Sequence, residues 1–110
     1  MDIAFKKGEK PEDWNQQKAL NKRHGAARAK LIRRRLDDLY AAPTLATMRN
    51  LPGRCHELKG ERAGQLSVDL DGPYRLVFQP TDPLPRKADG GLDWGTVVAI
   101  VVQEVADTHD

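Results

Sequence analysis

In residues 65–79 the sequence reads QLSVDLDGPYRLVFQ. Apolar and polar side chains alternate through Gln65–Leu70 and again through Tyr74–Gln79, which is the period of a strand with one buried face. Between the two runs, Asp71-Gly72 is a tight-turn signal, and the proline that follows adds stiffness. The stretch therefore predicts two antiparallel strands joined by a short turn.

The flanking sequence predicts further strands and two helices. Ile3–Lys6 alternates and predicts a short opening strand, while Val97–Val102 is β-branched and apolar on both faces, which predicts a central strand covered on both sides. A helix is expected over Pro11–Arg23, because proline suits a first helical turn and Gly25 can end or bend the helix. A second helix is expected over Ala26–Ala42, where apolar residues recur at three- and four-residue steps.

This order of elements predicts one α+β domain covering residues 1–110. The helical hairpin, about residues 11–42, is expected to pack on one face of a twisted, mainly antiparallel sheet. The short first strand and about residues 54–105 are expected to form that sheet. Residues 81–95 contain two prolines and three glycines without any period, and they are predicted to form a long loop.

Positive charge is concentrated in the first part of the chain. Residues 1–64 hold 15 lysines and arginines against 8 acidic residues, a net charge of +7, whereas residues 65–110 have a net charge of −5. Lys18–Leu36 holds eight basic residues and no acidic one. This segment is either a solvated helix face or a surface for nucleic acid or an acidic partner.

Cysteine and histidine usage excludes several site classes. The single cysteine, Cys55, excludes an internal disulfide and a multi-cysteine zinc site, and fits a reducing cytoplasm. His24, His56 and His109 are far apart and show no ligand spacing, so neither a metal nor another cofactor is expected. No apolar run reaches the ~18 residues of a membrane span, so we expect no membrane association.

Residues 51–62 concentrate basic and nucleophilic side chains beside a predicted short strand. Strand alternation places Arg54, His56 and Leu58 on one face and Cys55, Glu57 and Lys59 on the other. Adjacent strand residues point apart, so Cys55 is interpreted as a small buried side chain rather than as the nucleophile of a pair with His56. Taken alone, His56 and Lys59 are interpreted as two surface residues.

Two other candidates stand beyond this segment. Arg75 lies within a strand, where its guanidinium either pairs with Asp69 across the hairpin or presents its planar fork to a phosphate. At the end of the chain, His109 could act as acid or base near neutral pH, with Asp107 or Asp110 to orient it. Terminal residues are also often mobile, which leaves the role of this tail open.

These residues occur in an ordered set that resembles a known family. The segment Met48–Gly64, which includes HELKGERAG at residues 56–64, is followed by Leu66–Val68 and by GPYRLVF at residues 72–78. This set resembles the HigB branch of the RelE/ParE superfamily of type II toxins. That branch has a His-x-Leu-Lys-Gly-x-Arg-x-Gly segment, a short strand, a Gly-x-aromatic-Arg strand ending in Phe, and an Asp-Tyr-His tail.

The resemblance implies a RelE-like fold and a ribosome-dependent mRNA endonuclease that inhibits translation. Such enzymes use no metal and activate the ribose 2′-OH to attack the adjacent phosphate. By position, His56 and His109 match the family's histidines, Asp107 its tail aspartate, and Lys59 and Arg75 its phosphate-binding cations. The resemblance also implies contacts to RNA from further basic residues, namely Arg33, Arg34, Arg35, Arg54 and Arg62.

The partners implied are a cognate helix-turn-helix antitoxin and the ribosome with its mRNA and rRNA. Operator DNA would be bound only through the antitoxin, and the location would be cytoplasmic. Thr108 stands where the family has tyrosine. This difference keeps open an alternative function, a non-catalytic protein of the RelE/ParE fold that binds an antitoxin or inhibits gyrase.

Overall fold

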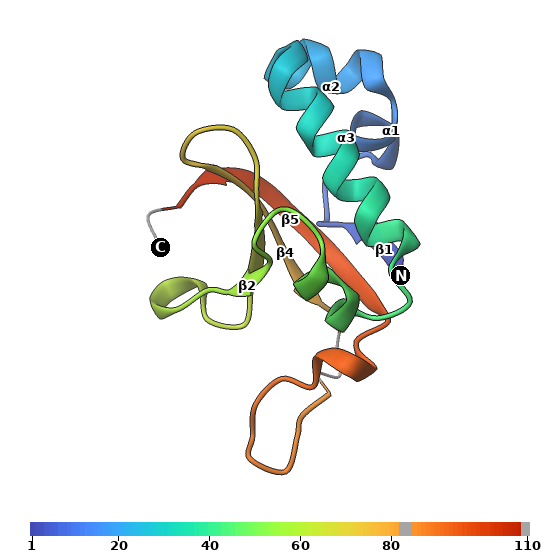
Figure 1. Ribbon diagram of the computed structural model, residues 1–110. Coiled ribbons are helices and arrows are strands. Elements are labelled where there is room, and N and C mark those ends of the chain that lie inside the picture. Colours follow the sequence, from blue (N-terminus) through green and yellow to red (C-terminus); the bar gives the residue numbers. More distant parts are fainter. Residues whose placement is uncertain (82–84, 109–110) are drawn as a thin grey trace.

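A five-stranded sheet forms the centre of the computed structural model, which describes residues 1–81 and 85–108 (Figure 1). The strand order is β1-β5-β4-β3-β2; β1 runs parallel to β5, and the other neighbours are antiparallel. The α+β prediction is therefore confirmed, including the hairpin of residues 65–79. The strands are β1 (Asp2–Phe5), β2 (His56–Glu57), β3 (Leu66–Asp69), β4 (Tyr74–Pro80) and β5 (Ala99–Asp107).

Three helices lie together on one side of this sheet (Figure 1). The single helix expected over Pro11–Arg23 is wrong, because the chain is extended at Gln16, with φ −105° and ψ 123°. Trp14 stacks on Phe5 with ring centroids 5.5 Å apart, a contact between elements that no local pattern announces. Gly25 ends the second helix with φ 82°, a left-handed value that glycine adopts at no steric cost. The helices are α1 (Pro11–Asn15), α2 (Gln17–His24) and α3 (Ala26–Ala41).

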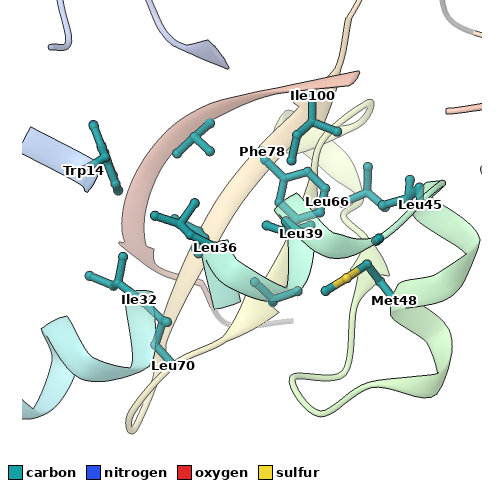
Figure 2. Close-up of a cluster of buried hydrophobic side chains, with 14 of the residues drawn as sticks. Trp14, Ile32, Leu36, Leu39, Leu45, Met48, Leu66, Leu70, Phe78 and Ile100 are labelled. Atoms are coloured by element: carbon teal, nitrogen blue, oxygen red, sulfur yellow. The ribbon is translucent and has the colours of Figure 1, made fainter. Parts of the chain in front are cut away.

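The hydrophobic core lies between α3 and the sheet (Figure 2). The apolar stripe of α3 meets alternate side chains of β3, β4 and β5, as the periods of the two patterns require. Fully buried members of this core include Ile32, Leu36, Leu39, Leu66, Leu76, Phe78 and Ile100.

The central position of β5 is confirmed, whereas its expected coverage on both faces is not. Ile100 and Val102 are fully buried, but Ala99 and Val101 are only half-buried. Val98, just before the strand, is 57% exposed. The reason is that α1–α3 cover one face of the sheet only.

The connections between strands are mostly irregular. Residues 85–93 stand away from the sheet as a loop (orange in Figure 1) with one bridge between Arg86 and Leu92. This loop leads into a short 3₁₀ turn, Trp94–Thr96, whose buried Trp94 belongs to the core. Two further 3₁₀ turns span Leu45–Asn50 and Gly60–Arg62. Over the described residues, no helix is long and apolar enough to cross a membrane.

Candidate active site

Strand register assembles a row of side chains on the sheet face opposite α3, here called the site face. His56 of β2 lies opposite Ser67 of β3, Ser67 opposite Val77 of β4, and Val77 opposite Glu104 of β5. Directly opposite residues share a face of a sheet. Because the alternate residues of β3 and β4 are in the core under α3, this row must point the other way.

The next row of the site face contains an arginine cluster around Asp69. Register pairs Asp69 with Arg75, and Arg75 with Ala106. The Asp69 carboxylate lies 2.8 Å from Arg75 Nε, and 3.3 and 3.4 Å from Arg54 Nε and Nη2. The expected cross-strand ion pair of Arg75 and Asp69 is therefore present, and Arg54 shares the same carboxylate.

Arg75 has further partners in the turn that precedes it. Its Nη1 donates to the carbonyl oxygens of Gly72 and Tyr74, at 3.1 and 2.9 Å. Its side chain is 14% exposed, whereas that of Arg54 is 55% exposed. Arg75 thus fixes the β3–β4 turn as well as carrying charge on the site face, and Arg54 is the more accessible guanidinium.

His56 stands beside this cluster. Its Nδ1 lies 2.9 Å from the carbonyl oxygen of Arg54, so that contact fixes the ring next to the arginines. Arg54 itself has φ 49°, a left-handed value uncommon for a residue other than glycine. Glu57 points to the other face, where it accepts a hydrogen bond from Trp94 Nε1 at 3.1 Å. The expected alternation of His56 and Glu57 is therefore confirmed.

The remaining cations of the segment lie around the 3₁₀ turn Gly60–Arg62. Lys59 immediately precedes this turn and is exposed. Arg62 donates to Gln65 Oε1 at 3.2 Å and to Glu104 Oε2 at 3.4 Å. Glu104 is the last residue of the row that begins with His56. Arg62 therefore contacts the site face at the β5 end of that row.

At the end of the chain the structure describes residues up to Thr108. Asp107 lies directly opposite Tyr74, whose ring packs against the core, so strand register places Asp107 on the opposite face from Arg75. Thr108, which follows β5, is buried. His109, the second candidate histidine, lies outside the described residues.

The three consecutive arginines of α3 have different environments. Arg33 is half-buried and donates to Asp37 Oδ1 at 3.0 Å and to the carbonyl oxygen of Trp14 at 3.2 Å. Arg34 is exposed. Arg35 is only 9% exposed, and its Nε donates to the carbonyl oxygen of Asp69 at 2.8 Å. Of the three, only Arg34 has an exposed side chain. Arg35 is a buried residue that holds the main chain of Asp69 in place.

A second arginine of α3, overlooked in the sequence, binds the same hairpin. Arg28 forms a two-pronged ion pair with Asp71, at 2.9 and 3.2 Å, and its guanidinium lies 3.6 Å from the Tyr74 ring centroid. The hydrogen bond from Arg28 lowers the pKa of the Asp71 carboxyl. Arg28 and Arg35 are seven residues apart in α3, so they share one face of the helix, and both contact the segment Asp69–Asp71. The seven-residue spacing of the two arginines in the helix is the signal that could have revealed them.

Cys55 is a packing residue, and the described residues form no cluster of metal ligands. Burial raises the pKa of the Cys55 thiol to about 12, which leaves it neutral and unreactive, in agreement with its interpretation as a packing residue. Across residues 1–81 and 85–108, no three His, Cys, Asp or Glu side chains come together in a group able to hold a metal ion.

Comparison with known proteins gives a structural match and no sequence match. No model of a known protein family matches the chain, and no curated protein matches it in sequence. Among solved structures, the chain is similar to a YoeB/ParE toxin from Agrobacterium tumefaciens, with a TM-score of 0.59 and 16% sequence identity. The match covers 99% of this chain and 100% of the toxin. The protein therefore has the RelE/YoeB-like α+β fold of that toxin.

Proposed function

We propose that this protein is the toxin of a type II toxin–antitoxin pair and cleaves mRNA on the ribosome. The observation that carries the proposal is the grouping of His56 with Arg54, Arg75 and Arg62 on one face of the sheet. A fold shared with a YoeB/ParE toxin supports it. His56 belongs to the HigB-like motif of residues 56–64, and the HigB assignment is part of the proposal.

The chemistry requires a base, an acid and cations. Attack of the ribose 2′-OH on the adjacent phosphorus needs a group that accepts its proton, and departure of the 5′-oxygen needs a group that donates one. His56 is proposed for one of these roles and His109 for the other. Arg54, Arg75 and Lys59 would stabilise the charge that develops on the phosphate oxygens. Asp107 is proposed to act on His109 at the chain end rather than on the arginine cluster.

Recognition of the ribosome and of a partner is assigned to other basic residues. Arg34 is exposed on α3, and Arg33 and Arg62 are held near the surface by carboxylates that RNA phosphates could replace. We propose that these residues contact rRNA and mRNA, and that a helix-turn-helix antitoxin binds the protein in the cytoplasm and links it to operator DNA.

The direct test is cleavage of mRNA on programmed ribosomes by the wild type, His56→Ala and His109→Ala. Loss of a general acid or base should lower the cleavage rate at least about 100-fold in each variant. Arg86→Ala, in the loop far along the chain from the site, is the matched control and should retain wild-type cleavage. A variant His56→Ala that cleaves as fast as the wild type would refute the assigned role.

A second function is favoured by one specific feature of the site. Arg75 already has three partners within the protein, an ion pair with Asp69 and hydrogen bonds from Nη1 to the carbonyl oxygens of Gly72 and Tyr74. A protein that binds an antitoxin or gyrase without cutting RNA does not need Arg75 to bind phosphate, so these internal contacts would not impair it. Absence of any cleavage by folded wild type on active ribosomes, together with tight binding to a neighbouring helix-turn-helix gene product, would favour this function.

A further inference from the structure

The Asp69 carboxylate occupies the position that a bound oxyanion would take between two guanidinium groups. Its Oδ1 lies 2.8 Å from Arg75 Nε and 3.4 Å from Arg54 Nη2, and its Oδ2 lies 3.3 Å from Arg54 Nε. Arginine forks bind carboxylate and phosphate oxygens with the same planar geometry. A phosphate group would therefore compete with Asp69 for the same donors.

The cluster is rich in guanidinium groups and is accessible. Two guanidiniums share one carboxylate, and a third, that of Arg35, is bonded to the backbone carbonyl of Asp69 at 2.8 Å. The side chains of Arg54 and Asp69 are 55% and 29% exposed, so an anion from solvent can reach the pair. On β5, the residue opposite Arg75 is Ala106, whose methyl group is small.

The Asp69 main chain is anchored independently of its carboxylate. Its N–H donates to the carbonyl oxygen of Gly53 at 2.7 Å, and its own carbonyl accepts from Arg35. Neither bond involves the carboxylate, so both should persist when it turns away or is replaced by an amide. Release of the arginines therefore need not disturb the strand that carries Asp69.

We propose that Asp69 is an internal stand-in for phosphate: it holds Arg54 and Arg75 in place in the free protein and is displaced from them when a phosphate group binds. The inference rests on the proposed function, since the phosphate it foresees is that of an RNA backbone. Asp69 then lowers the affinity of the protein for phosphate groups. Its carboxylate offsets the positive charge of the arginines until RNA binds.

The test compares wild type, Asp69→Asn and Asp71→Asn as full chains without ribosomes. Inorganic phosphate is titrated while the Nε–H signals of Arg54 and Arg75 are followed by NMR, and an eight-nucleotide uridine RNA is titrated by fluorescence anisotropy. Removal of a partly exposed competing carboxylate should tighten both affinities about fivefold. Asp71→Asn has the same charge change but a different partner, Arg28, and should leave both affinities unchanged.

Each outcome decides the inference. Equal or weaker phosphate binding by folded Asp69→Asn overturns it and makes Asp69 a simple positioning residue. If Asp69→Asn binds phosphate more tightly but RNA no more tightly than the wild type, the arginine cluster binds free phosphate. That result overturns its proposed role in RNA binding. In the wild type, phosphate should shift the Asp69 carboxyl carbon signal together with the two arginine signals. An unmoved Asp69 signal at saturation overturns the displacement even where the variant fails to fold. Binding here is measured without cleavage, so failure of the nuclease proposal is a separate result.

Discussion

Arg35→Ala should destabilise the protein strongly although an arginine in a basic helix is usually a surface residue. Arg35 is 9% exposed, and its Nε donates to the Asp69 carbonyl oxygen at 2.8 Å. Leaving that carbonyl unpaired costs about 1–3 kcal/mol. Removal of two buried methylene groups adds about 1.6 kcal/mol at roughly 0.8 kcal/mol each. We expect the free energy of unfolding to fall by about 3 kcal/mol.

Urea unfolding measures this loss directly. With an m value of about 1.5 kcal/mol/M for a domain of this size, a loss of that size moves the midpoint by about 2 M. Arg34→Ala, the exposed neighbour, is the matched control and should stay within about 0.5 kcal/mol of the wild type. Arg35→Met retains most of the packing and should lose only the hydrogen-bond part. An Arg35→Ala midpoint equal to that of the wild type, combined with loss of ribosome binding, would refute the structural role.

Three further predictions follow from the surroundings of Gly53, His24 and Cys55. Gly53 has φ 113°, and an added Cβ would lie 3.0 Å from Arg35 Nε, so Gly53→Ala should lower the free energy of unfolding by about 1–3 kcal/mol in the same urea assay. Burial, with Arg23 and Arg28 nearby, lowers the pKa of His24, so the unfolded chain binds more protons just below pH 6.5. Stability should therefore rise with pH through that window, and a His24→Gln variant with the same pH dependence would contradict this. The Cys55 thiol, with a pKa of about 12, should react with iodoacetamide at pH 8 far more slowly in the folded protein than in urea, and equal rates would refute its burial.

Local patterns predicted most of the fold, because the elements concerned are specified by neighbours in the chain. The hairpin of residues 65–79 needs only alternation and an Asp-Gly turn, and α3 needs only its apolar stripe. The break at Gln16 could not be predicted in this way. No glycine or proline marks it, and the Trp14–Phe5 stack is a tertiary contact. The partial exposure of one β5 face depends likewise on where the helices lie.

The candidate site was predicted unevenly for the same reason. Arg75 lies opposite Asp69 because the register of β3 and β4 follows from the hairpin turn, which the sequence encodes locally. Arg35 looked like a surface residue because helix periodicity describes an apolar stripe and says nothing of a guanidinium that bonds a distant carbonyl. Asp107 was grouped with Arg75 by analogy with a family tail, whereas its face depends on the register of β5 against β4.

The most direct test of the account is the chemistry of the RNA ends produced on programmed ribosomes. Purified wild type should cut within the ribosomal A site and leave a 2′,3′-cyclic phosphate and a 5′-OH, because the 2′-OH is the attacking group. His56→Ala should leave the RNA intact at the same protein and ribosome concentrations. Products with a 5′-phosphate, or intact RNA with folded wild type and active ribosomes, would contradict the account.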